Sequence, residues 1–265
     1  DGSWSRGLGD VYKRQDKERP GILSSDNDHV LKVKWNDLSS VEELLFNQGD
    51  DIACFISSPY DHPVSRDNSL PEDGYWQKLT DLCRKHNVIT IVDDVRAGFR
   101  IDLKGSNVHF GFDPDMICFG KAIANGHPLA ALVGKDDLKK AAEKVYFTGT
   151  QFFSAPPMAA AIATLDELKK FDAPKKLIKY GEKLNKRLVL VAKQKGFNLI
   201  ASGMPSMPYY RLDGVSFETH IKWIDECVKR GVYMLSYHNH FISLAHSEKD
   251  IDFIEGATKQ AFEAL

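Results

Sequence analysis

Four short apolar runs, each ended by polar or turn residues, constrain the fold of this chain more than any other feature. They lie at 52–56 (IACFI), 88–92 (VITIV), 116–119 (MICF) and 129–133 (LAALV). Runs that are apolar at successive positions, rather than at every second one, are typical of strands buried on both faces of a mostly parallel sheet. The pattern therefore predicts an α/β protein.

A helical repeat lies between the first two runs. In the segment 72–87, Trp76, Leu79, Leu82 and Cys83 recur at a spacing that places them on one face of a helix. A buried strand, an amphipathic helix and a second buried strand together predict a strand-helix-strand unit, which fits a parallel sheet.

After residue 150 helical patterns come first, and strands and helices then alternate. An alanine-rich helix is predicted to begin at Pro156 and Pro157 with Ser154 as its N-cap, and a long helix with an apolar stripe is predicted to end at Gly196. The lysines of the long helix lie opposite that stripe, so we interpret them as a solvated face. Further strands are predicted at 197–202, 207–214, 232–237 and 241–247, and helices at 216–231 and 248–265, the last beginning at Ser247.

The chain divides into three parts on this pattern. Residues 1–15 are dominated by Gly, Ser and Arg without periodicity and resemble a translated adaptor sequence, so we exclude them from the fold. Residues 16–172 are predicted to form part of a large domain, and residues 173–265 a small C-terminal α/β domain.

Composition narrows the partners and the location. A formal net charge of −2 gives no field that would gather nucleic acid or an anionic membrane surface. No apolar run approaches the roughly 20 residues that span a bilayer, and no signal peptide opens the chain. The four cysteines stand apart without C-x-x-C pairing, which favours reduced core thiols. We expect a soluble cytoplasmic protein that binds small molecules.

The residues at two strand ends can carry chemistry. Asp93 follows the second run and Lys121 the third, and ligands of parallel α/β sheets bind at the carboxyl ends of strands. A partly desolvated lysine amine forms imines with carbonyl groups, and a carboxylate nearby can hold a heterocyclic nitrogen protonated. This pair fits pyridoxal phosphate, and Gly149 and Thr150 could supply a backbone N–H and a hydroxyl to its phosphate. Spacing alone leaves a solvated lysine and turn aspartates as the alternative.

Several segments in order carry a resemblance to a known family. They are TIVDDVRAGFR at 90–100, DPDMICFGKAIANGHPLAALVG at 113–134, YFTGT at 146–150, ATLDEL at 163–168 and FISLAHSEKDIDFIEGA at 241–257. From about residue 31 to residue 265 the chain resembles class III pyridoxal-phosphate aminotransferases, especially the branch that contains glutamate-1-semialdehyde aminomutase.

The resemblance implies a fold-type I pyridoxal-phosphate transferase and a role for each matching residue. Lys121 would form an imine with the cofactor and carry the proton of the reaction, Asp93 would bind the pyridine nitrogen, and Val95 would pack on the ring. Thr150, which follows Gly149, would reach the cofactor phosphate of a neighbouring subunit, which implies a homodimer with its site at the interface. The implied reaction moves an amino group from an amino acid or amine to a carbonyl acceptor.

The chain also departs from the family pattern. Asp94 stands where Glu is usual, Arg96 where Met or Gln is common, and the loop after Lys121 keeps only Gly126 of several glycines. The segment 236–241, SYHNHF, lacks the glutamate of the aminomutase branch, which favours a transaminase over an intramolecular aminomutase. The substrate stays open.

Two further expectations concern the N-terminal region and a histidine pair. Family members carry a long N-terminal region with a phosphate-binding turn and a ring-stacking aromatic residue, so we expect a fragment that binds pyridoxal phosphate weakly or not at all. A non-catalytic fragment is the alternative of another class. His238 and His240 could share a strand face and ligate zinc, but no third ligand is near, so no metal is predicted and a channel role, an interface role or no role remains.

Overall fold

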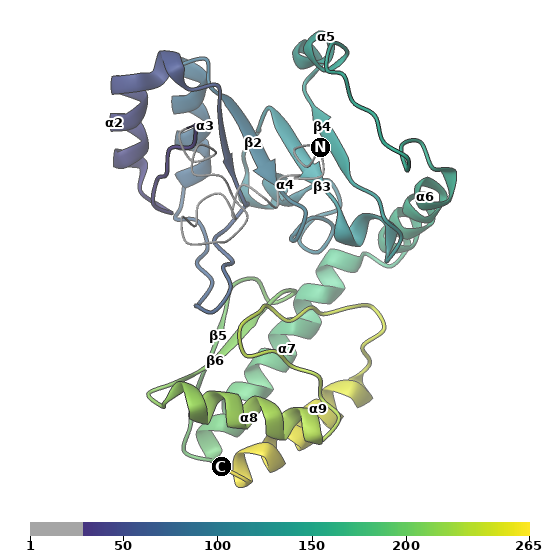
Figure 1. The fold of residues 1–265 in the computed structure, drawn as a ribbon. Coiled ribbons are helices and arrows are strands. Elements are labelled where there is room, and N and C mark those ends of the chain that lie inside the picture. Colours follow the sequence, from purple (N-terminus) through teal and green to yellow (C-terminus); the bar gives the residue numbers. More distant parts are fainter. Residues whose placement is uncertain (1–28) are drawn as a thin grey trace.

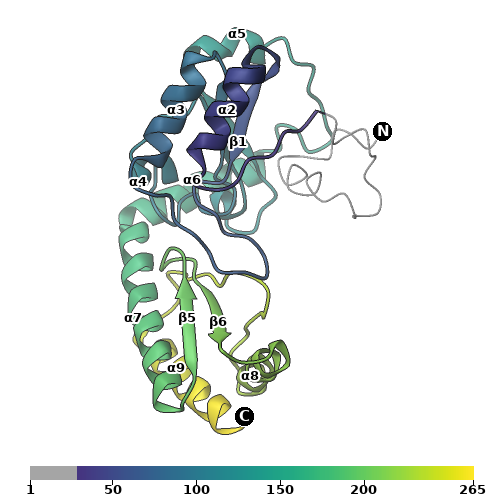
Figure 2. The same cartoon turned by 90° about the vertical axis from the view of Figure 1, so that its left-hand side faces the viewer.

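In the computed structural model, residues 29–265 are described, and they form two lobes arranged along a long helix, α7 (Ala173–Gln194) (Figure 1). We call the part that contains strands β1–β4 the sheet lobe, and the part that contains α7, α8 and α9 the C-terminal lobe. The helix begins beside the sheet lobe and runs the length of the C-terminal lobe (Figure 2). Helix α7 therefore connects the two lobes.

The sheet lobe is built on a four-stranded sheet in the order β1-β2-β3-β4. The first three strands are parallel and the fourth is antiparallel to β3. The predicted apolar runs all form strands, and the predicted mostly parallel sheet is confirmed; the last strand is antiparallel because its short connection holds no crossover helix. The expected burial of every strand on both faces is wrong for this edge strand, where Leu132 is 60% exposed and Val133 46%. The strands are β1 (Cys54–Ser57), β2 (Ile89–Asp93), β3 (Met116–Phe119) and β4 (Ala131–Gly134).

Helices α2 and α3 pack together beside the sheet, where α3 contacts β2 (Figure 1). The predicted helix between the first two strands is α3, and it buries Trp76 and Leu79 against the sheet, with the Trp76 ring stacked 4.3 Å from the ring of Phe112. The alanine-rich helix α6 packs on the short turn that begins at Lys121. The helices of this lobe are α2 (Leu38–Gln48), α3 (Tyr75–Lys85), α4 (Ser106–Phe110), α5 (Lys139–Ala142) and α6 (Ala155–Lys170), with 3-10 turns η2 (Gly49–Asp51), η3 (Lys121–Ala124) and η4 (Asp136–Leu138).

The C-terminal lobe packs three helices around a two-stranded antiparallel hairpin. Its strands are β5 (Asn198–Ser202) and β6 (Tyr209–Asp213), and its other helices are α8 (Phe217–Lys229) and α9 (Glu248–Glu263). The core centres on Trp223, whose ring stacks 5.3 Å from that of Phe262. The predicted start of the last helix is confirmed by a capping box between Ser247 and Asp250.

Four sequence predictions differ from the structure in detail. The segments 232–237 and 241–247 are not strands: the Leu235 N–H donates to the side chain of His240 at 3.2 Å, and the Ile242 N–H donates to the Ser206 carbonyl in a loop. Val232, Met234 and Ile242 are buried there without a strand ladder beside them. Ser154 is the N-cap of α6, but its hydroxyl makes no capping hydrogen bond. Of the four cysteines, Cys54 is exposed.

A loop between β1 and α3, residues 58–70, crosses from the sheet lobe to the C-terminal lobe (Figure 2). Arg211 on β6 donates to both carboxylate oxygens of Asp67, at 3.0 and 2.8 Å. The Asn68 N–H donates to the Ser202 hydroxyl at 2.9 Å. The buried Tyr60 side chain packs with Met204 and Met207. These contacts hold the two lobes against each other.

Candidate functional site

The carboxyl ends of the three parallel strands meet at one edge of the sheet. An ionisable side chain lies at or after each of these strand ends. His62 lies in the loop after β1, Asp93 is the last residue of β2, and Lys121 follows β3. Their charges interact, since Lys121 affects the pKa of both His62 and Asp93. The topology thus gathers a histidine, a carboxylate and an amine.

Lys121 holds an unusual backbone conformation. Its φ is +46°, in the left-handed region that costs a residue with a Cβ roughly 1–2 kcal/mol. Partial burial of the ammonium lowers its pKa, the guanidinium groups of Arg96 and Arg100 lower it further, and only Asp93 acts in the opposite direction. A strained backbone and a more easily deprotonated amine are both features of nucleophilic lysines.

Asp93 and Val95 lie against the base of that lysine. Asp93 is 8% exposed, and one carboxylate oxygen accepts a hydrogen bond from the Val95 N–H at 3.1 Å. Burial raises the pKa of Asp93, while the Val95 N–H, Lys121 and Arg96 lower it. A Cβ placed on Gly120 would meet the Val95 side chain at 3.2 Å, so Val95 packs beside the residue that precedes Lys121. The structure therefore brings together Asp93, Val95 and Lys121.

Asp94 faces away from this group and holds the loop in place. It is 1% exposed and accepts hydrogen bonds from the Ser106 N–H at 2.8 Å and the Ser106 hydroxyl at 2.6 Å. Burial raises its pKa to about 7, and the two hydrogen bonds from Ser106 act against that rise. The second aspartate of the pair is therefore structural.

Arg96 joins the two lobes at the site. Its Nη1 donates to the His62 carbonyl at 2.7 Å and contacts the His62 Nδ1 at 3.2 Å. It also donates to the Asn239 Oδ1 of the C-terminal lobe, at 3.3 Å. The neighbouring Arg100 lies 4.6 Å over the ring of Phe241, also in that lobe. The C-terminal lobe therefore fixes cationic groups beside Lys121.

Sequence reasoning missed His62 and Asn239. His62 follows a predicted strand end, so the strand-end rule that found Asp93 and Lys121 could have found it as well. Asn239 gave no signal of its own, because its place beside Arg96 depends on contact between residues 143 positions apart.

Gly149 and Thr150 lie elsewhere. Both are exposed on the segment that leads from α5 to α6, which runs outside the sheet (Figure 1). Nothing lies within 4 Å of a Cβ built on Gly149. Among the described residues no hydrogen bond joins either of them to Lys121 or Asp93.

The histidine pair does not converge on a common point. His240 Nε2 accepts from the Leu235 N–H at 3.2 Å, whereas His238 Nδ1 contacts the Asn239 carbonyl at 3.0 Å. The segment is not a strand, so the predicted shared face does not exist. Within residues 29–265 no group of three or more His, Cys, Asp or Glu side chains could hold a metal ion.

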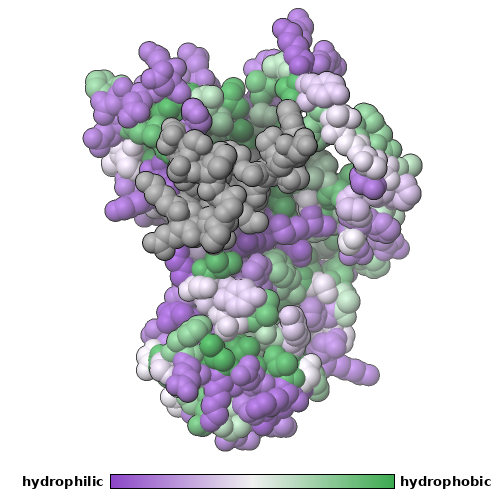
Figure 3. All heavy atoms as spheres, viewed as in Figure 1, coloured by the Kyte–Doolittle hydropathy of each residue, from purple (hydrophilic) through white to green (hydrophobic). Residues whose placement is uncertain are grey.

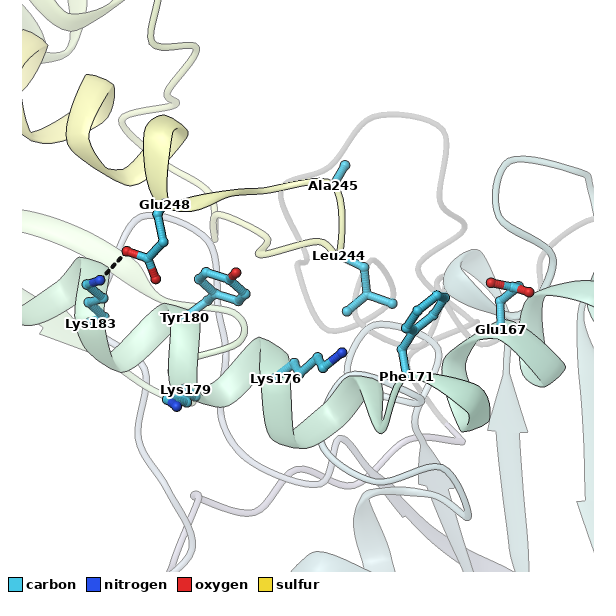
Figure 4. A pocket seen from close by; sticks show the side chains of 9 residues that line it. All are labelled: Glu167, Phe171, Lys176, Lys179, Tyr180, Lys183, Leu244, Ala245 and Glu248. Atoms are coloured by element: carbon cyan, nitrogen blue, oxygen red, sulfur yellow. Dashed lines mark hydrogen bonds and ion pairs between the residues drawn. The ribbon is translucent and has the colours of Figure 1, made fainter.

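A pocket of about 840 Å³ lies away from these residues, where α6 meets α7 (Figure 4). A salt bridge between Lys183 and Glu248 closes one end of it. None of Asp93, Val95 and Lys121 lines it, so geometry and chemistry favour the strand ends as the site. Its lining residues are Glu167, Phe171, Lys176, Lys179, Tyr180, Lys183, Leu244, Ala245 and Glu248.

The visible surface between the lobes is mainly hydrophilic (Figure 3). No helix among the described residues is both long and apolar enough to cross a bilayer.

The strand-end site as a whole offers an amine, a buried carboxylate and an apolar side chain to a small heterocyclic ligand that bears an aldehyde.

Comparison with known proteins agrees with this chemistry. A family model described as Aminotransferase class-III matches residues 20–247. The aminopentol aminotransferase of Sphingopyxis macrogoltabida is 36% identical over 246 residues, which are 92% of this chain and 58% of that protein. The glutamate-1-semialdehyde 2,1-aminomutase of Desulforamulus reducens is 29% identical over 262 residues, which are 92% of this chain and 60% of that protein.

A solved structure of the FumI protein of Sphingopyxis sp. MTA144, in its PLP internal aldimine form, matches with a TM-score of 0.90 and 36% identity. The match covers 94% of this chain and 60% of that one. The predicted fold-type I architecture is confirmed by this likeness. The chain spans about three fifths of the length of each of these relatives.

Proposed function

The chain belongs to the class III aminotransferases, and on that premise we propose that the whole protein moves an amino group from an amino acid or amine to a carbonyl acceptor. Its cofactor is pyridoxal 5′-phosphate, as in the FumI structure that it resembles. The observation that carries the proposal is the gathering of Lys121, Asp93 and Val95 at the carboxyl ends of adjacent parallel strands.

These residues fit the cofactor chemically. The Lys121 amine, with its lowered pKa, would bind the aldehyde carbon, and the buried Asp93 carboxylate would hold a proton on the ring nitrogen. Val95 would pack against the ring. When bound, pyridoxal phosphate supplies an electron sink for the substrate carbon. Lys121 Nζ would then carry the proton to and from that carbon.

We propose that Gly149 and Thr150 bind the cofactor phosphate of a second subunit in a homodimer. Their segment is exposed and apolar: Tyr146 is 80% exposed and Phe153 77%. Side chains of this kind on a surface mark a contact site for another chain. A second copy of this chain suits that surface, because Thr150 has no hydrogen-bond partner of its own among the described residues.

Transamination is favoured over intramolecular amino transfer. The aminotransferase relative is 36% identical and the aminomutase relative 29%. The segment SYHNHF also lacks the acid that the aminomutase branch carries. A panel of amino donors with separate keto acids should give net transfer of the amino group, whereas a mutase would give none.

We also propose that residues 16–172 belong to the large domain and residues 173–265 to the small domain of the fold. The proposed non-native segment 1–15 lies outside the described residues. A cytoplasmic location is supported by four cysteines that are all free thiols in the described structure.

Reductive labelling tests the proposal directly. In the whole protein, pyridoxal phosphate and borohydride should attach one pyridoxyl group to the peptide that contains Lys121, as read by mass spectrometry, because reduction makes an imine permanent. Residues 1–265 alone should be labelled weakly or not at all. Lys121→Ala should lose this label. Lys135→Ala is the matched control and should keep it, since Lys135 is held by ion pairs to Asp113 and Asp115. Labelling of Lys121→Ala at the wild-type level would contradict the proposal.

A further inference from the structure

We propose that His62 is a ligand-binding residue, which donates a hydrogen bond from its Nε2 to an oxygen of the molecule bound at the strand-end site. The inference rests on the proposed function, because that molecule is either pyridoxal phosphate or the carboxylate substrate that reacts with it. His62 lies outside the segments between residues 90 and 257 that resemble the family.

The imidazole ring of His62 is held in one orientation. The side chain is 8% exposed, and the Arg96 Nη1 lies 3.2 Å from Nδ1 and 2.7 Å from the His62 carbonyl. On another side the Tyr60 ring meets the imidazole edge to face, with ring centres 4.9 Å apart. A ring fixed by a guanidinium, by its own backbone and by an aromatic neighbour cannot rotate to find another partner.

This orientation determines the tautomer. A guanidinium has only donors, so the Nδ1 that faces Arg96 must accept, and the proton of the neutral ring lies on Nε2. Burial and the charges of Arg96 and Lys121 lower the pKa of His62 to about 3, so the ring stays neutral at every physiological pH. Nε2 is therefore a permanent, uncharged hydrogen-bond donor.

That donor has no acceptor in the described part of the chain. Nε2 is buried and unpaired among residues 29–265. A buried N–H without an acceptor loses its hydrogen bonds to water and gains none in the protein, which destabilises the fold. Such groups are therefore rare in folded proteins, and each calls for an explanation. The other buried donor of this kind near the site, the Tyr60 hydroxyl, lies close to the Met204 backbone.

The position of His62 explains the unpaired donor. His62 follows β1, which pairs with β2, the strand that ends at Asp93. The charge of Lys121 is near enough to lower the pKa of His62. Arg96, Arg100 and Lys121 also make this end of the sheet cationic. Ligands with phosphate, phenolic or carboxylate oxygens suit such surroundings, and each offers the acceptor that Nε2 lacks.

Two substitutions distinguish hydrogen bonding of His62 to the ligand from hydrogen bonding of His62 to Arg96. In His62→Gln the side-chain amide nitrogen takes the place of Nε2, and the acceptor for Arg96 is lost. In His62→Asn the amide oxygen takes the place of Nδ1, and the donor toward the ligand is lost. If His62 binds the ligand, the Gln variant should behave like wild type and the Asn variant should not.

The readouts distinguish the two sources of the oxygen. A dissociation constant for pyridoxal phosphate that rises roughly tenfold to a hundredfold in His62→Asn but not in His62→Gln assigns the acceptor to the cofactor. An unchanged dissociation constant with a KM for the keto acid raised by a similar factor, again only in the Asn variant, assigns it to the substrate. The proposal is overturned if the Asn variant matches wild type in both measurements, or if the Gln variant is as impaired as the Asn variant.

A proton–nitrogen NMR spectrum of the imidazole groups gives a test that needs no turnover. Among the slowly exchanging Nε2–H signals of the full chain, one should disappear in His62→Gln, and that signal should shift on addition of pyridoxal phosphate, inorganic phosphate or acetate. A signal that none of these ligands moves overturns the proposal. Failure of the proposed function is seen separately, as absence of label on Lys121 while the His62 signal still responds to phosphate or acetate.

Discussion

Asp94 shows how a single buried carboxyl can be tuned for structure while its neighbour Asp93 faces the site. The carboxyl of Asp94 is 1% exposed, and within residues 29–265 it accepts hydrogen bonds from Ser106, through both the backbone N–H and the hydroxyl. Burial raises the pKa of Asp94 to about 7 against an ordinary value of 3.8. The folded protein therefore binds a proton here that the unfolded chain releases between these two values.

This shift predicts a pH dependence of stability. Asp94 contributes its full stabilisation below pH 4, and the contribution is lost as the pH rises through about 7, because only the folded state keeps the proton in that window. Relative to Asp94→Asn, the free energy of unfolding of the wild type should fall by on the order of 2–4 kcal/mol between pH 4 and pH 7. Urea denaturation at several pH values measures the difference.

Asp115 provides a control of opposite sign. Hydrogen bonds from Thr90 and Lys135 hold the pKa of Asp115 below its ordinary value, against the effect of burial. Its stabilisation is therefore present above pH 4 and is lost only as the pH falls below that value. Asp115→Asn should leave the pH 4 to 7 trend of the wild type intact. If the free energy of unfolding depended on pH in the same way for the wild type and for Asp94→Asn, a raised pKa of Asp94 would be refuted.

At the scale of elements, two helical glycines have opposite surroundings. A Cβ on Gly181 of α7 would lie 1.8 Å from the Pro205 carbonyl oxygen, so the helix and the loop after β5 meet with no room for a methyl group. A Cβ on Gly256 of α9 would meet nothing within 4 Å. The same substitution should therefore change stability in opposite directions.

Alanine at each position tests that packing. Gly181→Ala should lower the free energy of unfolding by roughly 2–4 kcal/mol, since backbone must move to relieve the clash. Gly256→Ala should raise it by about 0.5–1 kcal/mol, because alanine favours the helix. Chemical denaturation of both variants gives the two values. Equal effects at the two sites would mean that α7 and the Pro205 loop are not in contact.

The elements also show how far sequence reasoning reaches. Apolar strands and amphipathic helices follow from local patterns, so β1, β2, β3 and α3 were predictable. The direction of β4 and the irregular path of 232–247 were not, because each depends on which distant backbone groups are near. At the site the same division holds: strand ends point to Asp93 and Lys121, whereas Asn239 is placed by the meeting of two lobes.

At the scale of the whole molecule, the exposed aromatic segment before α6 predicts an assembly. Its largest side chains, Tyr146 and Phe153, are 80% and 77% exposed, and Phe152 packs on Phe153 with ring centres 4.4 Å apart. Such a surface is stabilised when a second copy covers it.

Sedimentation of three proteins tests the dimer. The wild type should sediment as a dimer, and Phe153→Ser should shift it toward monomer by removing apolar contact area. Phe217→Ser is the matched control, because Phe217 is 66% exposed on α8 in the other lobe, and it should sediment as the wild type does. A monomeric wild type, or equal behaviour of the two variants, would contradict the homodimer.

The contacts of the loop 58–70 also link the formation of the site to the order in which the chain is translated. The sheet can form once Gly134 has been translated, but the loop that carries His62 has anchors at Ser202, Arg211 and Tyr237. Each anchor lies well over a hundred residues after the loop in the sequence, and contacts between such distant residues form slowly. A nascent chain therefore contains Lys121 and Asp93 before it contains the residues that hold His62 in place.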